Sequence, residues 1–562
     1  MRDTVVLAIK KATGFGESLL EAPEIEVHGD YSTNVAMVLA KSQAKDPRDL
    51  AGELVDKLKR DQELLKIVAK IEMDGPGFIN FWLSQEALLE NLREVNEKKE
   101  SYGSSEVGKD KNVVVEYSSP NIAKRFGVGH LRSTVIGQAL YNLYRFLGYK
   151  VVGDNHTGDW GTQFGTLLYQ IDSKRLDAAK LTIDELEDLY VKFNSEAKND
   201  EKLWDEARAY FKKLESGDAK IRDIWKSLVS ISQKEFDRIY ELLGVKIDNS
   251  YGESFYEDEV PNVVEEVRSK GLSKKSEGAE IIEFNNMPPA MLIKSDGTST
   301  YFTRDLATIK FRKGEWEPEL IIYEVGSDQT LHFRQVFQTA KLLGWDDKIH
   351  YEHVAHGLIR FPHGKMSTRR GETVNLEDVL EEAIARAKGI IDKSETGRGL
   401  TSSEKEKVAK SVGIGAVKYF DLTHHPSSDI IFDWEKIFVL EGNSAPYLQY
   451  SVARTNSVLQ KSGKSTQKIG ELKTDKLNSE ELSVLRTLPR FSDVIVDSAK
   501  NYSPNLLANY LFDLAQRYNN FYNQHRIIGG ENEEMRIALT AGVGVVLKNG
   551  LGILGIETPE KM

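Results

Sequence analysis

The segment from residue 113 to residue 153 constrains the fold more than any other part of the chain. The β-branched run 113–117 has the composition of a buried strand. A polar, glycine-containing loop follows over 118–130, and apolar residues then recur at helical spacing over 131–147. A second β-branched run begins at residue 150. A strand, a glycine loop, a helix and a strand in this order predict the βαβ unit of a nucleotide-binding α/β fold.

The rest of the chain divides into regions with different patterns. Residues 1–100 combine helical patterns with a strand pattern after a Pro-Gly turn, which predicts a small α+β module. The α/β core would extend over 101–385, with a charged, helix-patterned insertion near 172–250. Strand patterns nearly vanish after about residue 380, so we expect a helical connection over 386–440 and an all-helical domain over 441–562.

Two finer expectations depend on this division. The polar stretch 96–111 is the first candidate for a linker between the module and the core. In the C-terminal region, the apolar spacing predicts helices over 444–460, 482–498 and 505–523. The predicted fold class is therefore α/β in the core, α+β before it and all-α after it.

Composition excludes several kinds of chemistry. The chain of 562 residues has no cysteine, which rules out disulfides, iron–sulfur clusters, cysteine-ligated zinc and a thiol nucleophile. The net charge of −12 argues against a protein that coats nucleic acid broadly, although it is compatible with a local basic face. No apolar run reaches the length of about 18 residues that a membrane span needs, and the first residues lack the cleavage site of a signal peptide.

The glycine loop before the first core helix is the first candidate site. A helix N-terminus presents free N–H groups and a partial positive charge, which suit the phosphates of a nucleotide. Gly127 and Gly129 would let a base or ribose approach the backbone, while His130 could donate a hydrogen bond and Lys124 could add charge. The competing interpretation is a plain glycine-rich turn before a helix.

A basic loop more than 200 residues later is the second candidate site. Lys365, Met366, Ser367 and Thr368 are followed by Arg369 and Arg370. A loop of this composition could grip phosphates and close on the charge that develops on pyrophosphate. Taken alone, such a loop is more often a solvated surface turn.

The two loops together resemble the two signatures of class I aminoacyl-tRNA synthetases, and the chain as a whole resembles the arginyl-tRNA synthetases. The stretch Asn155-His156-Thr157-Gly158-Asp159-Trp160-Gly161-Thr162-Gln163-Phe164-Gly165 is close to specific for that family. Segments 120–124 and 130–134 fit its extended first signature. Further similar segments are 28–34, 252–256, 301–307, 326–333, 447–454, 511–518 and 554–562.

The resemblance implies a fold and a reaction. The core would be a Rossmann-like catalytic domain, the N-terminal module would contact the outer corner of tRNA, and the C-terminal domain would bind the anticodon. The enzyme would activate L-arginine with ATP to arginyl-adenylate and pyrophosphate, and then transfer arginine to the 3′-terminal ribose of tRNA(Arg). Mg²⁺ would accompany ATP, and bound tRNA would be needed for activation.

The resemblance also assigns residues, with several roles shared. The catalytic set would be Lys124, Gly127, Gly129, His130 and Lys365. ATP would be bound by Gly129, His130, His332, Lys365, Met366 and Ser367. Arginine would be bound by Asn121, Glu253, Tyr301, Asp305 and Gln329. Transfer RNA would be bound by Tyr447, Tyr450, Arg454, Arg517 and Tyr518, together with Tyr522 and Arg526. A supporting role near ATP and arginine would go to His156, Asp159 and Trp160.

The chemistry of these side chains fits the implied ligands. A guanidinium offers a planar fork of donors that carboxylates hold in bidentate fashion, and a pocket built for it should reject lysine. Tyrosines mixed with arginines suit stacking on unpaired bases. The competing interpretations are ordinary: an acidic residue on an exposed helix face, a histidine that caps a turn, and aromatic residues in the core of amphipathic helices.

The chain departs from the family pattern in three places. Gly127 stands where the family usually has a histidine that helps hold the phosphates of ATP, and Arg125 stands where it has proline. Thr368 replaces the usual second lysine of the basic loop, where Arg369 or Arg370 could supply the charge. We hypothesise that His130, Lys124 or Arg125 covers part of the role of the missing histidine.

Other functions also fit parts of the sequence. Another class I synthetase or a nucleotidylyltransferase would share the core, but the latter would lack the helical C-terminal domain and the paired acidic residues. A catalytically silent relative is favoured only by Gly127, and a generic ATP-binding structural protein ranks third. We expect a cytoplasmic monomer with no membrane contact, no metal held by the protein and no structural zinc.

Overall fold

The centre of the molecule is a five-stranded parallel sheet in a computed structural model that describes residues 1–15, 19–23, 25–198, 200–361, 374–394, 396–463 and 477–562. The strand order is β12-β11-β5-β6-β7, and every neighbouring pair is parallel. The five strands are β5 (Asn112–Glu116), β6 (Lys150–Thr157), β7 (Asn249–Gly252), β11 (Leu320–Gly326) and β12 (His350–His356). This sheet confirms the α/β core expected from the sequence.

The helix that follows the glycine loop is α6 (His130–Phe146), and it crosses from β5 to β6 as predicted. Most of α6 is buried, because it packs against the sheet on one side and against the C-terminal helices on the other. Gly137 permits this close approach, since a Cβ there would lie 2.1 Å from the Cβ of Tyr117. The glycine therefore fixes how closely α6 lies against β5.

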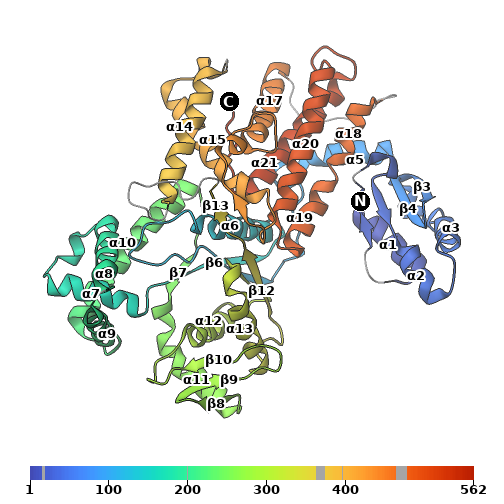
Figure 1. Ribbon diagram of the computed structural model, residues 1–562. Helices are drawn as coiled ribbons and strands as arrows, with labels where there is room; N and C mark the ends of the chain where they lie inside the picture. Colours follow the sequence, from blue (N-terminus) through green and yellow to red (C-terminus); the bar gives the residue numbers. More distant parts are fainter. Residues whose placement is uncertain (16–18, 24, 199, 362–373, 395, 464–476) are drawn as a thin grey trace.

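Helices on the other side of the sheet belong to a second core cluster. There, α12 (Tyr301–Trp316) precedes β11, and α13 (Thr330–Leu342) connects β11 to β12. A small antiparallel sheet beside them consists of β8 (Ser273–Ser276), β9 (Ala279–Ile282) and β10 (Ala290–Ile293). The helical insertion predicted near 172–250 lies to one side (Figure 1) and contains α8 (Ile183–Ala197), α9 (Glu201–Glu215) and α10 (Ala219–Leu243). The helix α7 (Thr162–Ser173) precedes the predicted insertion and packs against α9.

The N-terminal module is an antiparallel sheet covered by helices. Its strand order is β1-β2-β4-β3. The strands are β1 (Leu20–Glu21), β2 (Tyr31–Thr33), β3 (Val68–Asp74) and β4 (Phe78–Leu83). The helices of the module are α1 (Arg2–Thr13), α2 (Val35–Gln43), α3 (Pro47–Leu58), α4 (Gln62–Leu65) and α5 (Gln85–Lys98).

The C-terminal part is helical in the residues that are described, apart from β14 (Ile430–Ile431), which pairs with β13 (Ile359–Arg360). Its helices are α14 (Leu376–Lys393), α15 (Ser402–Leu422), α16 (Trp434–Ile437), α17 (Ala445–Ser462), α18 (Ser479–Thr487), α19 (Arg490–Lys500), α20 (Pro504–Gln524) and α21 (Glu533–Ile553). The helix predicted over 482–498 is two helices, α18 and α19. Pro489 separates them, because its ring lacks the N–H that a continuous helix would need.

Two observations refine the expectations drawn from sequence, one about the predicted linker and one about a C-terminal helix. The polar stretch 96–111 is not a loose linker, because the amide of Asn96 donates to the carbonyl of Ala538 over 3.1 Å and the ring of Tyr102 stacks on Phe491. Helix α21 is long and apolar enough to span a membrane by length and composition alone. Of its most apolar window, 72% is buried inside the molecule, as in the core helix of a globular domain.

Candidate active site

The glycine loop between β5 and α6 has an unusual backbone that buried side chains hold in place. Ser118, Ser119 and Ala123 have φ angles of 76°, 47° and 61°, which non-glycine residues rarely adopt. The N–H of each donates a hydrogen bond of 2.8–3.0 Å to a side chain of a different element. The acceptors, in the same order, are Ser133 Oγ of α6, Asn155 Oδ1 of β6 and Ser232 Oγ of α10. Strain that the surroundings maintain in this way is typical of functional loops.

The N-terminus of α6 is open where the loop enters it. A Cβ on Gly129 would meet no atom within 4 Å, so the backbone there is accessible. The ring of His130 packs 5.1 Å from the ring of Phe126, and its Nδ1 lies 3.3 Å from the carbonyl oxygen of Gly127. Burial lowers the pKa of His130, so this imidazole is neutral near pH 7 and can serve a ligand as a hydrogen-bonding group.

The segment that follows the basic loop lies against the glycine loop. The N–H of Val128 donates to the carbonyl of Val374, and the N–H of Leu376 donates to Phe126, both over 2.8 Å. Residues 374–376, which directly follow the basic loop, are therefore hydrogen-bonded to the glycine loop. The predicted residues Lys365, Met366, Ser367, Thr368, Arg369 and Arg370 themselves lie outside the described residues.

The two cations of the glycine loop have partners on α8. The ammonium of Lys124 lies 4.6 Å from the ring centre of Tyr190. The guanidinium of Arg125 pairs with Asp184 and lies 3.9 Å from Glu187. These carboxylates compete with a phosphate for Arg125, so of the three candidates for the role of the missing histidine Arg125 is the one already held by an ion pair. His130 and Lys124 are the other two candidates.

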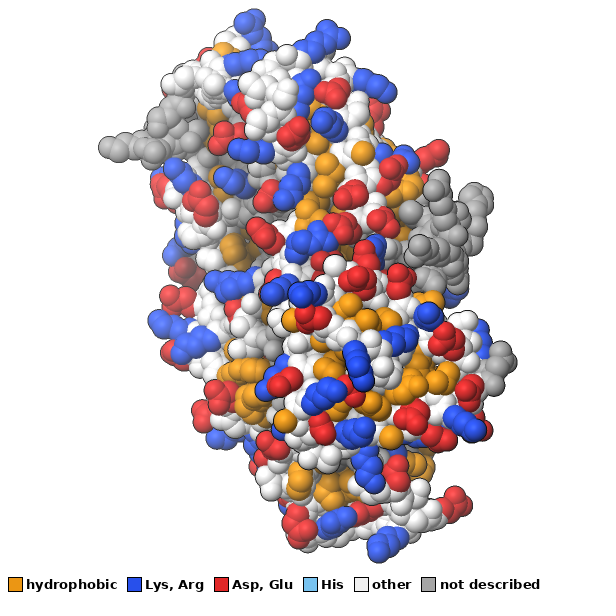
Figure 2. Space-filling view, turned by 90° about the vertical axis from the view of Figure 1, so that its left-hand side faces the viewer, with side chains coloured by type: hydrophobic (Ala, Val, Ile, Leu, Met, Phe, Trp, Pro, Cys, Tyr) orange, Lys and Arg blue, Asp and Glu red, His pale blue; other side chains and the backbone are white. Residues whose placement is uncertain are grey.

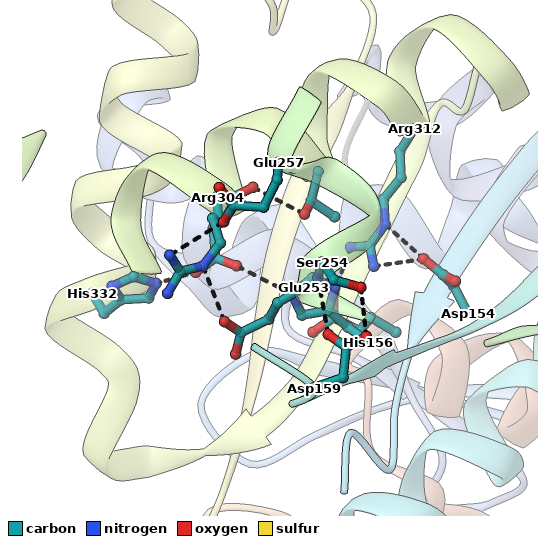
Figure 3. A network of polar contacts seen from close by, with 12 residues as sticks. Asp154, His156, Asp159, Glu253, Ser254, Glu257, Arg304, Arg312 and His332 are labelled. Carbon is teal, nitrogen blue, oxygen red and sulfur yellow. Dashed lines mark hydrogen bonds and ion pairs between the residues drawn. The ribbon is translucent and has the colours of Figure 1, made fainter. Parts of the chain in front are cut away.

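Asp305 lies between two histidines of a polar network, His156 and His332, which Figure 3 labels. Its Oδ2 contacts Nε2 of His332, and its Oδ1 lies 3.8 Å from Nε2 of His156. Burial raises the pKa of Asp305, but the hydrogen bond and charge of His332 outweigh it, so the pKa is lowered. The pKa of His332 is raised by the same carboxylate against the effect of its own burial, whereas burial lowers the pKa of His156. The result is an ionised, partly exposed carboxylate held by a histidine.

Glu253 already has a guanidinium beside it. Nε of Arg304 donates to its Oε2 over 3.0 Å, and the same guanidinium reaches Glu257 at 3.5 Å and lies 4.7 Å from the ring centre of Tyr301 (Figure 3). Burial raises the pKa of Glu253 to about 8 although Arg304 opposes the rise. The sequence analysis gave Asp305 and Glu253 the same role toward the ligand arginine. Because Glu253 is already paired with Arg304, Asp305 is the carboxylate more available to the ligand. Tyr301 is 57% exposed, so its ring is accessible to a ligand.

Asp159 shapes the turn that carries Glu253. It accepts hydrogen bonds from the N–H and Oγ of Ser254 over 2.9 and 2.6 Å, and Gly252 leaves room for its carboxylate. Trp160 is buried, and its ring packs edge-on against Phe211 and Trp225. We therefore assign Trp160 to the core and Asp159 to support of the site.

Asn121 and Gln329 both lie where parallel strands end. The Asn121 loop pairs with Gly158 after β6, and Gln329 follows β11 directly before α13. Both residues are exposed. Because carboxyl ends of parallel strands meet at one edge of a sheet, the two side chains share the edge where such folds bind ligands.

Sequence analysis missed a buried ion cluster behind the site. Arg312 of α12 is completely buried and pairs with Asp154 over 2.6 Å and with Glu116, while its guanidinium lies 5.2 Å from the ring centre of Tyr323. The sequence did carry an indication of this cluster, because each of the two apolar strand patterns contains an acidic residue, Glu116 after three valines and Asp154 after Gly153. Burying charge requires such pairing. The cluster anchors α12, and with it Asp305, to the sheet.

The residues predicted to bind tRNA divide into two groups. The guanidinium of Arg454 lies between the rings of Tyr450 and Tyr522, 5.0 and 4.6 Å from their centres. These three residues line a cavity of about 760 Å³, which Arg526 also lines, and Tyr447 lines an adjoining one of about 510 Å³. Tyr518, in contrast, is completely buried and so cannot meet a base in this conformation. Arg517 is paired with Glu26 and Asp513.

Known proteins match the chain along its whole length. Residues 1–83 match the family model described as arginyl tRNA synthetase N terminal domain, 91–434 match tRNA synthetases class I (R), catalytic domain, and 448–562 match the DALR anticodon binding domain. The arginine–tRNA ligase of Clostridium botulinum (strain Okra / Type B1) is 41% identical over 557 residues, which cover 97% of this chain and 96% of that one. The chain belongs to the arginyl-tRNA synthetase family.

Further relatives agree with this membership. The arginine–tRNA ligase of Clostridium kluyveri (strain NBRC 12016) is 42% identical over 98% of this chain and 96% of its own. The arginyl-tRNA synthetase structure from Plasmodium falciparum superposes with a TM-score of 0.85 at 25% identity, covering 100% of this chain and 98% of that one. The Thermus thermophilus structure gives 0.82 at 24% identity over all of both chains and supports the fold. Membership confirms the predicted class I fold and the predicted ATP-dependent ligase activity.

Proposed function

We propose that the chain joins L-arginine to tRNA(Arg) with Asp305 as the carboxylate that receives the guanidinium of arginine. The observation that carries this assignment is the ionised Asp305 carboxylate. Among the described residues its Oδ1 accepts no side-chain hydrogen bond, and Nε2 of His156 lies 3.8 Å from it. Tyr301 lines the same side, and Asn121 and Gln329 would hold the α-amino and carboxylate end. Glu253 contributes through Arg304, which it holds against Tyr301.

ATP would lie against the N-terminus of α6. The free N–H groups of the helix would face the phosphates, Gly129 would leave room for the sugar, and His130 and Lys124 would add a hydrogen bond and a charge. Lys365, Met366 and Ser367 of the basic loop would contact the phosphates, as the family motif implies. His332, which the resemblance assigned to ATP binding, would instead hold Asp305. The described residues include no group of three or more His, Asp or Glu placed to hold a metal ion. We propose that Mg²⁺ arrives with ATP, where it neutralises phosphate charge.

The reaction needs positioning and charge neutralisation more than a protein nucleophile. A carboxylate oxygen of arginine attacks the α-phosphorus of ATP, and the bond from that phosphorus to the bridging oxygen breaks to release pyrophosphate. A ribose hydroxyl at the 3′ end of tRNA then attacks the carbonyl carbon of arginyl-adenylate. AMP leaves, and the hydroxyl proton passes to solvent or phosphate.

Transfer RNA would be read by the cavity around Arg454. A guanidinium held between two tyrosine rings offers a flat cationic surface on which unpaired bases can stack. Tyr447 and Arg526 would line the same region, whereas Tyr518 and Arg517 are left out because one is buried and the other is paired. Acidic and basic side chains are interspersed over the face shown in Figure 2, so that face is not broadly basic.

The regions would divide the work as the family does. Residues 1–100 would contact the outer corner of tRNA, 101–385 would carry catalysis, and 386–440 would connect the core to the anticodon-binding domain over 441–562. The chain would act as a monomer in the cytoplasm, away from membranes. Size-exclusion chromatography with light scattering tests the oligomeric state.

Aminoacylation of total tRNA with each proteinogenic amino acid tests the proposal. We expect charging with arginine alone, and a loss of about 100-fold or more in kcat/KM for arginine in Asp305→Asn, because a buried cation would lose its counter-charge. Asp347→Asn, an exposed aspartate, is the matched control. Charging with another amino acid would refute the arginine pocket. Binding of arginine and tRNA without charging would favour the catalytically silent relative and point to Gly127.

A further inference from the structure

The two oxygens of Asp305 have different neighbours. Oδ2 is engaged by Nε2 of His332, whereas Oδ1 has His156 at 3.8 Å, which is longer than a hydrogen bond. The side chains of Asp305 and His332 are 20% and 25% exposed, and that of His156 is 11% exposed. The Asp305 carboxylate is therefore partly exposed to solvent, with Oδ2 engaged by His332 and Oδ1 beyond hydrogen-bonding distance of His156.

Asp305 dominates the electrostatic surroundings of His332. From α12, Phe302 also faces the ring, and Phe333 of α13 packs edge-on at 5.3 Å. The other charged or titratable groups near it are Glu116 of β5 and His353 of β12. Arg312 pairs with Glu116, so that charge is largely compensated. In the protein without arginine, the imidazolium of His332 thus has one main counter-charge, and that counter-charge is Asp305.

We propose that His332 is a positioning residue for arginine recognition, whose imidazolium holds the Asp305 carboxylate in the empty pocket and releases its proton to solvent when the guanidinium of arginine arrives. The proposal rests on the proposed role of Asp305. It assigns to His332 a task different from contact with ATP, and it makes arginine binding a proton-linked event.

The order of events follows from the chemistry of the two cations. A guanidinium stays charged at any pH that a protein tolerates, whereas an imidazole near pH 7 does not. When both crowd one carboxylate, the imidazole is the group that gives up charge. Neutral His332 can still donate its Nε2–H to Oδ2, so Asp305 stays aligned while Oδ1 and the guanidinium form the new contact. The raised pKa of His332 in the empty pocket fits this exchange.

The direction of the pH effect can be derived from this exchange. At low pH, arginine must displace a proton from the Asp305–His332 pair, and its apparent affinity falls by up to tenfold for each pH unit. Above the pKa of His332 in the empty enzyme, no proton remains to be displaced, and affinity becomes independent of this group. Citrulline, a neutral isostere of arginine, brings no charge and should release no proton.

The test is calorimetric titration of the full chain with arginine at several pH values, in buffers of different ionisation enthalpy, which counts the protons released. We expect release of up to one proton per arginine at pH 6–7 and almost none at pH 9. His332→Gln keeps an N–H donor at the position of Nε2 but cannot titrate, so its release should vanish while its affinity at pH 8 stays within about threefold of the parent. His332→Phe suits the aromatic surroundings but lacks the donor, and should bind at least tenfold more weakly at every pH.

A second readout guards against effects on folding. At saturating ATP and tRNA, the pH profile of KM for arginine should flatten in His332→Gln, while kcat changes less. His350→Gln, an exposed histidine paired with Glu352, is the matched control and should keep the parental profile. Proton release that persists in His332→Gln, or an unchanged affinity in His332→Phe, would overturn the inference. Parental arginine binding by Asp305→Asn would instead refute the proposed role of Asp305, so the two failures are distinguishable.

Discussion

The hydroxyl of Tyr31 donates a hydrogen bond to Asp493 over 2.9 Å and joins the N-terminal module to α19 across 462 residues of sequence. Further polar contacts cross the same boundary, between Arg2 and Asp497, Asp30 and Arg486, and Glu26 and Arg517. The module is therefore attached to the helical C-terminal domain at several points. A tRNA that touched both parts would meet them in one fixed relation.

Replacing Tyr31 by phenylalanine should weaken this attachment. Asp493 is partly buried, and burial raises its pKa although Tyr31 opposes the rise, so loss of the hydroxyl leaves a partly desolvated carboxyl without its donor. We expect a loss of about 1–3 kcal/mol, seen as a lower melting temperature. Tyr210→Phe, which removes a similar bond to Asp172 in the insertion, is the control and should cost less, because that pair is closer to solvent. An equal loss in both variants would contradict a special role for the boundary.

Glu253→Gln should change how stability depends on pH. Burial raises the pKa of Glu253 to about 8, so the folded protein keeps this proton over a range in which the unfolded chain, with a pKa near 4.5, has released it. The free energy of unfolding therefore falls as pH rises between these two values. In Glu253→Gln this fall should be smaller, which melting temperatures measured from pH 5 to pH 8 would reveal. Glu283→Gln, an exposed glutamate paired with Lys274, should leave the slope unchanged.

Sequence patterns predicted the elements that carry the site better than the contacts within it. The β-branched runs and the glycine loop located β5, α6 and β6 closely, because buried parallel strands and helix starts have strong local patterns. The pairing of Glu253 with Arg304 was not predictable in this way. Arg304 is adjacent to Asp305 in sequence, and only the turn of α12 decides which side chain faces which carboxylate.

The same limit applies to the helical domain. Tyr518 and Tyr522 lie one helical turn apart on α20, yet one is completely buried and the other is 36% exposed. Helical spacing alone does not say which edge of an apolar stripe meets another helix, since the packing of α17 and α21 decides it. Pro489 did carry a readable indication of a helix break within the predicted 482–498 helix.

Gly158→Ala should impair arginine binding through Asn121. A Cβ at this position would lie 2.1 Å from Oδ1 of Asn121, so the amide has to move. If Asn121 holds the α-amino or carboxylate end of arginine, KM for arginine should rise about tenfold, which corresponds to about 1.4 kcal/mol of lost binding. Steady-state aminoacylation measures it. Gly314→Ala in α12, where a Cβ meets nothing within 4 Å, is the control. An unchanged KM would remove Asn121 from the pocket.

Arg454→Ala should weaken tRNA binding. The variant removes the cation between Tyr450 and Tyr522 and lets the rings collapse toward each other. We expect KM for tRNA to rise about 10–100-fold, since stacking on one such platform is worth about 1–3 kcal/mol per base. Arg145→Ala removes an arginine that lies over Tyr141 on α6, far along the sequence from this cavity, and should leave KM for tRNA unchanged. Equal effects of the two variants would argue for a loss of general positive charge.

Gly129→Ala tests whether ATP binding, rather than folding, requires a glycine at the start of α6. Gly129 precedes α6 with φ −60° and ψ −28°, a conformation that alanine adopts readily, and its Cβ would enter open space. The melting temperature should therefore stay the same or rise slightly, because alanine has less conformational entropy to lose on folding than glycine. If the ribose of ATP approaches the backbone here, the added methyl group blocks it, and KM for ATP should rise at least about tenfold. Gly389→Ala on the exposed face of α14 is the control, since its Cβ also meets nothing. A rise in KM for ATP in Gly129→Ala alone, at an unchanged melting temperature, would show that ligand approach requires this glycine. An unchanged KM for ATP would mean that ATP keeps its distance from the start of α6, and the proposed binding mode would have to be abandoned.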